Sequence, residues 1–244
     1  RIYISLFKSY FYLKYFTFHT SSEFETEDAK RALDKDFRFR LAYAISPDIP
    51  EKKYVAALKK GKKEGELDVV FISRIDKMKN LHFAIEVLQE VRSKVKFNIY
   101  GPISNPSYWS ECLELANRVP ENINVKYHGE ALREDFLSIY SHSDLFFLPT
   151  LGENYGHAIV EALGHGCPVL ISDNTQWDLI QEKGAGWVIP LSHKTQYINK
   201  IDELAFLNDD AMIQYRENAR DFYLEIINNN QIINLYKKLF KITT

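Results

Sequence analysis

Six short apolar runs, separated by longer segments with helical periodicity, constrain the fold of this chain more than any other feature of its sequence. The runs are predicted strands at residues 67–73, 95–100, 123–128, 145–149, 169–172 and 186–189. Several of them are β-branched and apolar on both faces, as strands covered by helices on both sides require. Alternation of strand and helix favours an α/β class with a parallel sheet.

The segments between these strands carry helix signals. Asn80 can cap a first helix whose apolar residues recur at helical spacing, and Pro106 suits the first turn of a second. Further helices are expected at 132–142, 155–163 and 176–183, where Gly184 makes a C-terminal stop. The repeated β-α order predicts a Rossmann-like parallel sheet with helices on both faces.

The first fifty residues differ from the rest of the chain. They contain an aromatic helix or strand, a helical stretch at 23–33 and an extended stretch that ends near Pro47 and Pro50. We therefore predict a remnant of another domain at 1–50, a linker at 51–65, the Rossmann-like domain at 66–205 and C-terminal helices at 206–244. A start at Arg1 rather than Met indicates a piece of a longer protein.

Composition excludes several classes of function. A formal net charge of -2 gives no general attraction to nucleic acid. Cys112 and Cys167 form no C-x-x-C pair, so neither zinc nor redox chemistry is indicated, and a reducing, cytoplasmic setting fits best. The aromatic opening at 1–18 is too short and too charged to cross a bilayer. Peripheral contact with the inner membrane face stays open, below plain burial.

A loop at 151–154, directly after one predicted strand, is the first candidate binding element. Ligands of open α/β sheets bind beyond the carboxyl ends of strands, and the following helix start suits a phosphate. Gly156 allows close approach to the backbone. Glu153 and Glu161 would lie about 12 Å apart in a continuous helix, and could grip hydroxyl groups on either side of an anion. The alternative is a helix-start acid and a solvated glutamate.

A second element, at 72–80, follows the first strand of the same domain. Arg74 and Lys79 would project into the crevice that the strand ends create. Their charges could hold a diphosphate and stabilise it as it leaves. Either cation alone is more often a solvated surface residue, but both elements are expected at the same edge of the sheet.

These motifs resemble family 4 of the retaining nucleotide-sugar glycosyltransferases, of the GT-B type. That family carries a strand-end G-R-x-x-x-x-K motif and two glutamates separated by seven residues. The matching positions are Ser73-Arg74, Lys79-Asn80, Glu153-Asn154-Tyr155-Gly156-His157 and Glu161, with Tyr100-Gly101-Pro102, His128-Gly129-Glu130, Ser143-Asp144-Leu145 and Gly166-Cys167-Pro168-Val169 between and after them. The resemblance covers 66–190, and 18–50 weakly as the end of the acceptor domain. Ser73 departs from the usual glycine.

The resemblance implies a role for each matched residue. It places Arg74 and Lys79 on the donor diphosphate, Glu153 on the transferred sugar and Glu161 on the ribose. A wider set would contact the donor: the backbone groups of Asn154, Tyr155 and Gly156, the ring of His157, and the loop of Gly129 and Glu130 near a uracil or guanine base. The other six histidines are interpreted as structural.

The implied reaction moves a sugar from a UDP- or GDP-linked donor to a hydroxyl of a carbohydrate or lipid-linked acceptor, with retention. Cell-surface polysaccharide or lipopolysaccharide synthesis is the implied pathway. No metal or other cofactor is expected, because no D-x-D motif lies at a predicted strand end and Asp209-Asp210 falls in a helical tail. With the acceptor domain largely absent, this piece should transfer little sugar.

Three alternatives stay open at this point. The first is a nucleotide-sugar epimerase or phosphorylase of the same architecture, and the second is a non-catalytic nucleotide-binding module. The third, a dinucleotide-dependent oxidoreductase, is disfavoured because no G-x-G-x-x-G follows the first predicted strand.

Overall fold

The computed structural model describes residues 16–33, 37–42, 49, 61–228, 234–235, 237 and 239–240. The chain divides into two compact units, one formed by 1–46 with 227–244 and the other by 47–226. Most of the predicted aromatic opening, residues 1–15, lies outside the described residues, as do 51–60 of the predicted linker.

Among its described residues, the smaller unit has two parallel strands and the helix that connects them. β1 (Thr17–Thr20) pairs with β2 (Arg38–Leu41), and α2 (Glu23–Ala32) connects them. Ser22 caps this helix by accepting a hydrogen bond from the Glu25 N–H at 3.1 Å. The Glu25 carboxylate accepts in return from the Ser21 N–H at 2.6 Å. The predicted helix at 23–33 is confirmed.

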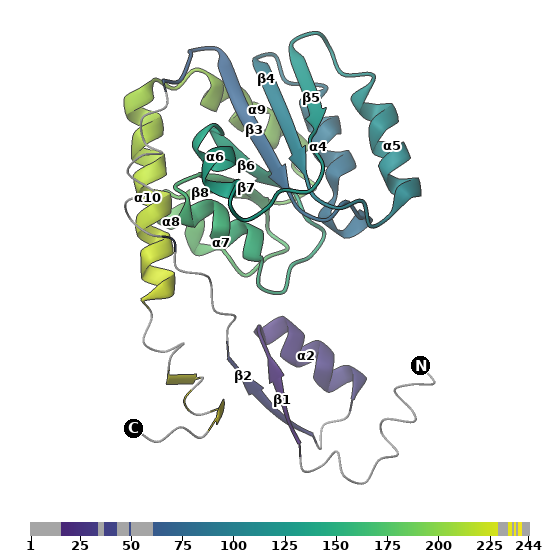
Figure 1. Ribbon diagram of the computed structural model, residues 1–244, viewed down its shortest axis with the longest axis vertical. Coiled ribbons are helices and arrows are strands. Elements are labelled where there is room, and N and C mark those ends of the chain that lie inside the picture. Colours follow the sequence, from purple (N-terminus) through teal and green to yellow (C-terminus); the bar gives the residue numbers. More distant parts are fainter. Residues whose placement is uncertain are drawn as a thin grey trace. The chain divides into compact units, whose positions relative to one another are not determined.

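The larger unit is built on a six-stranded parallel sheet in the order β5-β4-β3-β6-β7-β8 (Figure 1). Each predicted strand is confirmed to within one residue at either end. The strands are β3 (Glu66–Ile72), β4 (Lys94–Tyr100), β5 (Ile123–Tyr127), β6 (Leu145–Leu148), β7 (Val169–Ser172) and β8 (Gly186–Ile189). The predicted α/β, Rossmann-like class is therefore confirmed.

Helices pack on both faces of this sheet (Figure 1). One face carries α4 (Leu81–Leu88), α5 (Pro106–Ala116) and α9 (Lys194–Ala205), with α4 in contact with both other helices. The other carries α6 (Phe136–Ser141), α7 (His157–Gly164) and α8 (Leu179–Glu182), followed along the chain by α10 (Asp209–Ile227). In the described part of the chain, no helix is both long enough and apolar enough to cross a membrane.

Three local helix predictions need correction, and one is confirmed. Pro106 does occupy the first turn of α5, behind the capping residue Asn105. Asn80 precedes α4, but it adopts a left-handed conformation (φ 61°) and its side chain makes no capping hydrogen bond. The helices predicted at 132–142 and 176–183 are shorter, because α6 begins at Phe136 and α8 at Leu179.

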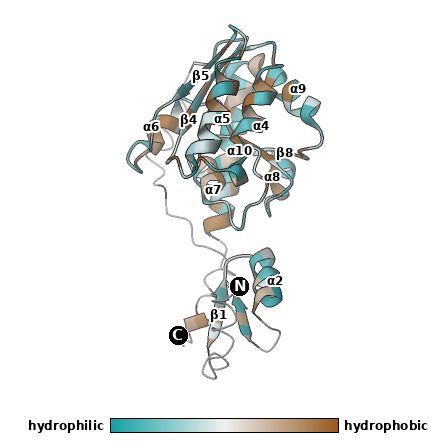
Figure 2. Ribbon diagram, turned by 90° about the vertical axis from the view of Figure 1, so that its right-hand side faces the viewer, coloured by the Kyte–Doolittle hydropathy of each residue, from teal (hydrophilic) through white to brown (hydrophobic). Residues whose placement is uncertain are grey.

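The two halves of the sheet are covered differently. Every residue of β6 and β7 is buried, as the prediction of doubly covered strands requires. β4 differs, because its buried Val95, Phe97 and Ile99 alternate with the more exposed Lys94 and Lys96. The polar residues of β4 and β5 appear as teal along both strands in Figure 2. Helix coverage on both faces is therefore complete only around β6 and β7.

The strand order creates a switch point. From β3 the chain builds outward to β4 and β5, then returns to form β6 on the other side of β3. At such a reversal the connections after the two central strands leave toward opposite faces and open a crevice at their carboxyl ends, where ligands of α/β proteins bind. The loops after β3 and β6 meet at this place, and they are the two elements that the sequence singled out.

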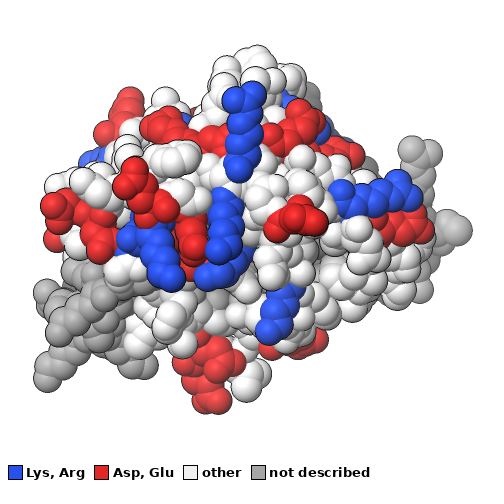
Figure 3. All heavy atoms as spheres, turned by 90° about the horizontal axis from the view of Figure 1, so that it is seen from above, with Lys and Arg blue, Asp and Glu red and all other residues white. Residues whose placement is uncertain are grey.

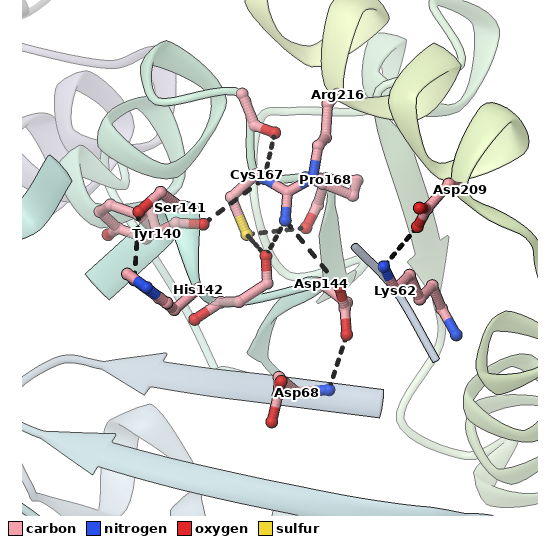
Figure 4. A network of polar contacts seen from close by, with 12 residues as sticks. Lys62, Asp68, Tyr140, Ser141, His142, Asp144, Cys167, Pro168, Asp209 and Arg216 are labelled. Carbon is pink, nitrogen blue, oxygen red and sulfur yellow. Dashed lines mark hydrogen bonds and ion pairs between the residues drawn. The ribbon is translucent and has the colours of Figure 1, made fainter. Parts of the chain in front are cut away.

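Arg216 of α10 ties this helix to the sheet through a buried polar network (Figure 4). Its guanidinium donates to the carbonyl groups of Ser143 and Gly166, which follow α6 and α7. It also lies 3.9 Å from the carboxylate of Asp144, which accepts a 2.8 Å hydrogen bond from the N–H of Asp68 in β3. The buried guanidinium of Arg216 therefore connects α10 to the residues that follow α6 and α7 and, through Asp144, to β3.

Candidate functional site

The loop after β3 presents Lys79 through a short, well-capped turn. The carboxylate of Asp76 accepts hydrogen bonds from the N–H groups of Met78 (2.9 Å) and Lys79 (3.2 Å), so it caps the 3-10 helix η2 (Lys77–Lys79). Asn80, buried and left-handed, then turns the chain into α4. The sequence analysis missed Asp76, although an aspartate just before a short helical turn is a common cap.

The loop after β6 is bonded to the same turn. The N–H of Leu151 donates to the carbonyl of Met78 at 2.8 Å, and the buried hydroxyl of Thr150 lies 2.9 Å from that oxygen. The hydroxyl of Ser172, at the end of β7, donates in turn to the carbonyl of Thr150. Two loops some seventy residues apart in sequence are thus fixed to each other.

An ion pair between Lys79 and Glu153 crosses the junction of these loops. The lysine Nζ donates to Oε1 of the glutamate, and the two side chains are only 12% and 13% exposed. The N–H of Glu153 donates to the carbonyl of Asn174 at 3.1 Å, which fixes the loop from the β7 side. With little water around them, these charges hold each other more firmly than a surface pair does. The structure brings these two predicted site residues into direct contact.

Arg74 lies in the same loop as Lys79 but is held loosely. Its guanidinium is 3.9 Å from the second carboxylate oxygen of Asp76, and its side chain is 66% exposed. Within the described part of the chain it makes no ion pair with Glu153 or Glu161. An exposed guanidinium beside the crevice can swing toward an incoming anion at little energetic cost.

The start of α7 combines a tight backbone with a buried aromatic pair. Gly156 has a φ of 80°, and a Cβ at this position would come within 2.9 Å of Ile159 and 3.1 Å of the Trp177 indole nitrogen. That nitrogen donates to the carbonyl of Tyr155 at 2.5 Å, so one of the backbone groups predicted to face the donor is already engaged. Trp177 was not singled out from the sequence, where nothing distinguishes it from an ordinary core aromatic.

Two further predicted residues, Asn154 and His157, lie on either side of the buried Tyr155 and Gly156. Asn154 and His157 are exposed, and the ring of His157 lies 5.0 Å from that of Tyr155. Among the described residues, the N–H groups of His157 and Ala158 at the helix start donate no hydrogen bond. Such N–H groups, at the positive end of a helix dipole, are suited to an anion.

Glu161 is part of α7 and is half-buried. Burial raises the pKa of its carboxyl group above the ordinary value, and the nearby charge of Arg133 partly offsets that rise. No described residue donates a hydrogen bond to this carboxylate. The 12 Å estimate for Glu153 and Glu161 assumed a continuous helix, and this premise is wrong because α7 begins only at His157.

Gly129 and Glu130 lie at the edge of the sheet, after β5. The carbonyl of Gly129, a residue with a φ of 80°, accepts a hydrogen bond from the N–H of Gly101 at 2.8 Å. Glu130 is exposed. Because β4 separates β5 from β3, this loop lies farther along the rim than Lys79 and Glu153. Among the predicted site residues, Lys79 and Glu153 are therefore bonded to each other at the centre of the rim. Arg74 lies beside this pair, and the loop of Gly129 and Glu130 lies farther along the rim.

Metal-ligating residues do not gather in the part of the chain that the structure describes. No group of three or more His, Cys, Asp or Glu side chains is placed there to hold an ion. Both cysteines are buried, and neither is part of a disulfide bond. The polar groups at the rim include the cations of Lys79 and Arg74, the carboxylates of Asp76 and Glu153, and the N–H groups at the start of α7.

The fold of this chain is similar to that of glycosyltransferases of known structure. Anabaena HepE, solved in complex with UDP-glucose, matches with a TM-score of 0.74 at 17% identity, over 99% of this chain and 67% of that one. This is a GT-B glycosyltransferase fold.

The family is shown by the sequence itself. Residues 56–222 match the model of glycosyl transferases group 1, and the chain belongs to this family. It is 21% identical to a 41.2 kDa protein in the cps region of Klebsiella pneumoniae over 72% of this chain and 46% of that protein. It is 23% identical to glycosyltransferase 335 of Sulfolobus islandicus rod-shaped virus 1 over 70% of this chain and 54% of that protein. The chain thus spans about half the length of these curated relatives.

Proposed function

We propose that this chain binds the sugar donor of a retaining glycosyltransferase. The donor is a nucleoside-diphosphate sugar, and the sugar passes to an acceptor hydroxyl with retention at the anomeric carbon. The observation that carries this proposal is the shielded Lys79–Glu153 pair at the switch point of a glycosyl transferases group 1 domain. It is supported by the similarity to family 4 motifs and by the UDP-glucose complex of HepE, a protein of the same fold.

Donor binding would exchange the partner of Lys79. In this structure the ammonium group of Lys79 pairs with the carboxylate of Glu153. A diphosphate arriving at the crevice offers Lys79 two or more negative oxygens and releases the Glu153 carboxylate for hydroxyl groups of the sugar. One polar contact is thereby replaced by two, and neither charge is left unpaired at any stage.

The transfer step places its charge where the cations lie. The bond between the anomeric carbon and the diphosphate oxygen breaks, and its electron pair stays on that oxygen. The acceptor oxygen forms the new bond to the same carbon, and its proton passes to the departing diphosphate oxygen. The negative charge that grows on the diphosphate would be stabilised by Lys79, by the exposed Arg74 and by the N–H groups of His157 and Ala158. This set of groups requires no divalent metal, and we propose that none takes part.

The remaining assignments follow from the similarity to relatives. A UDP- or GDP-linked donor, with Glu161 on the ribose and Gly129 and Glu130 near the base, is the proposed arrangement. The acceptor is a carbohydrate or a lipid-linked carbohydrate, and the pathway is synthesis of a cell-surface polysaccharide, as the position of one relative in a cps region favours. We place the reaction on the cytoplasmic side, with peripheral membrane contact.

A binding experiment tests the proposal. The 244-residue chain is titrated calorimetrically with UDP, GDP and their glucose and mannose conjugates, and one nucleotide is expected to bind with 1:1 stoichiometry. Lys79→Met should weaken that binding at least tenfold, because a cation that contacts phosphate is lost. The matched control is Lys94→Met, which removes an exposed lysine paired with Glu66 and should leave the affinity unchanged. Equal effects of both variants would contradict the proposal.

A further inference from the structure

A stacked aromatic pair lies at the carboxyl ends of β4 and β5, on the same rim as the proposed donor site. Tyr100 is the last residue of β4, and His128 follows β5 by one residue. Their rings are nearly parallel, with an interplanar angle of 9° and centroids 4.6 Å apart. His128, interpreted as structural from the sequence, is exposed to solvent. Because Tyr100 covers one face of the imidazole, the other face can take a third ring.

The main chain beside this pair is bonded to two loops that are proposed to contact the donor. The N–H of Ser73, directly before Arg74, donates to the carbonyl of Tyr100 at 3.1 Å. The N–H of the next residue, Gly101, donates to the carbonyl of Gly129 at 2.8 Å. A Cβ at Gly101 would lie 1.9 Å from the Ser73 carbonyl oxygen, so only glycine permits this close approach. The aromatic pair therefore lies between the proposed phosphate contact and the proposed base loop.

The imidazole of His128 is held in one orientation and is uncharged. Its Nε2 lies 2.8 Å from Oδ1 of Asn98, which lies two residues before Tyr100 on β4. Partial burial, and to a smaller extent the charge of Lys126, lower the pKa of His128 below its ordinary value. The ring is therefore neutral at pH 7. A flat ligand can cover it without removing a charge from water.

The position of the pair suits the base of a nucleotide whose diphosphate lies near Arg74. β5 is separated from β3 by β4 alone. Neighbouring strands are about 4.8 Å apart, so His128 lies about 10 Å along the rim from the strand that leads to Arg74. A ribose can bridge a gap of this size between a base and a diphosphate. Beside His128, no described atom beyond the chain neighbours of Gly129 lies within 4 Å of where a Cβ of this glycine would be, which leaves room for a ring.

We propose that the nucleobase of the donor stacks on the exposed face of His128, with Tyr100 behind the imidazole as the second layer of the stack. This inference rests on the proposed function and names the side chains that hold the base. Stacking on an aromatic side chain accepts any base, because every base has a π-face. The pair therefore supplies affinity for a nucleotide over a bare diphosphate, and the choice between uracil and guanine falls to polar groups at the edge of the base.

The test compares removal of the ring at His128 with its replacement by another ring. The 244-residue chain and its variants are titrated calorimetrically with UDP and GDP, and with inorganic pyrophosphate followed by ³¹P NMR. His128→Ala should weaken binding of the preferred nucleotide roughly tenfold, the effect of one stacked base, and leave the pyrophosphate Kd unchanged. His128→Phe keeps a flat ring and should retain most of the affinity. Tyr100→Leu should weaken binding less, because this ring reaches the base only through His128.

The matched control is His193→Ala. His193 is also exposed but follows β8, at the opposite edge of the sheet, and its removal should change neither Kd. A second readout is the ¹H spectrum of the bound nucleotide, in which ring currents should move the base protons upfield in the wild-type complex and not in His128→Ala. Wild-type nucleotide affinity in His128→Ala, or an equal loss for pyrophosphate, would overturn the inference and leave the proposed function standing. Failure of the wild-type chain to bind either nucleotide would overturn the proposed function, and the inference with it.

Discussion

The charged side chains at the two rims of the sheet differ in how far they are exposed to solvent. At the amino ends of the strands, Lys94 pairs with Glu66 at 2.9 Å and Lys96 with Asp68 at 3.6 Å, in step with the parallel register of β3 and β4. The two lysine side chains are 61% and 53% exposed, and the two carboxylates are 29% and 24% exposed. Figure 3, seen from above Figure 1, shows basic and acidic groups intermixed on that face rather than separated by sign. Such pairs contribute little to stability and attract no particular ligand.

At the carboxyl ends, the central ion pair is better shielded than the pairs of the amino rim. Lys79 and Glu153 neutralise each other with little exposed area, and Glu161 is half-buried without a hydrogen bond from the described residues. Placing charge there has an energetic cost that the amino rim avoids. The proposed donor site would use these shielded groups, whereas the proposal assigns no ligand to the amino rim.

The largest expected effect comes from breaking the shielded pair. Glu153→Ala leaves the Lys79 ammonium without its partner in a poorly hydrated place, and should lower the free energy of unfolding by about 2–3 kcal/mol. Adding Lys79→Met should restore at least half of that loss. On the amino rim, Glu66→Ala should cost much less, because its ion pair with Lys94 is in contact with solvent. Urea denaturation measures all three, and equal losses at the two rims would remove the distinction between them.

Arg74→Ala should lower the affinity for nucleotide without changing the stability of the fold. Because the guanidinium is exposed and only loosely paired with Asp76, the midpoint of urea unfolding should not move. Nucleotide affinity should fall about tenfold, as expected when one charge-assisted contact to phosphate is lost. Arg92→Ala, an exposed arginine just before β4, is the control and should change neither quantity. A stability loss in Arg74→Ala without any loss of affinity would count against the site.

The pH dependence of stability should have opposite signs at the two rims. Burial raises the pKa of Glu161, so the folded state holds this proton more tightly than the unfolded state does. Its contribution therefore becomes less favourable as pH rises from the ordinary glutamate pKa of about 4.3 through the raised value. Glu161→Gln should accordingly raise the Tm at pH 7, and the gain should vanish below pH of about 4.

At the amino rim, the hydrogen bond with Lys94 lowers the pKa of Glu66. Stability from that residue is present above the ordinary pKa and is lost as pH falls through the lowered one. Glu66→Gln should thus slightly lower the Tm at pH 7 and have no effect in acid. Thermal scans of both variants between pH 3 and pH 8 check the pair, and a gain for Glu66→Gln at pH 7 would contradict it.

The smallest expected effect is that of chelation. We expect the calorimetric Kd for the preferred nucleotide to be the same in EDTA and in millimolar Mg²⁺, since the proposed diphosphate contacts come from cations of the chain. A tenfold weakening in EDTA would show that the diphosphate is bound through a metal.

The fold could be predicted from sequence because its signals are local. Buried strands such as β6 and β7 are unbroken apolar runs, and their order along the chain limits the topology to few choices. The shortened α6 was missed because Leu132 looks like a core position. The Asp135 carboxylate instead accepts a hydrogen bond from the Leu132 N–H and stabilises a turn, which leaves this leucine exposed.

The site could be predicted only in outline. That Lys79 and Glu153 lie at one rim follows from the strand order, but their direct pairing depends on how two distant loops are bonded. Arg216 and Arg220 would be assigned to a solvated helix face from their spacing alone. Both are buried, because their guanidinium groups donate to carbonyls of Gly166 and Gly164 at the end of α7. A burial of this kind depends on tertiary partners that no local pattern contains.

The carbonyl of Met78 has a practical consequence for engineering. Since this one oxygen accepts from the residue that leads into the glutamate loop, the lysine turn and the glutamate loop behave as a single part. Attempts to retarget the chain by grafting from a homologue should therefore transplant 74–80 together with 150–157. A graft of either segment alone would combine the lysine turn of one protein with the glutamate loop of another, and the two side chains would then not be positioned to pair.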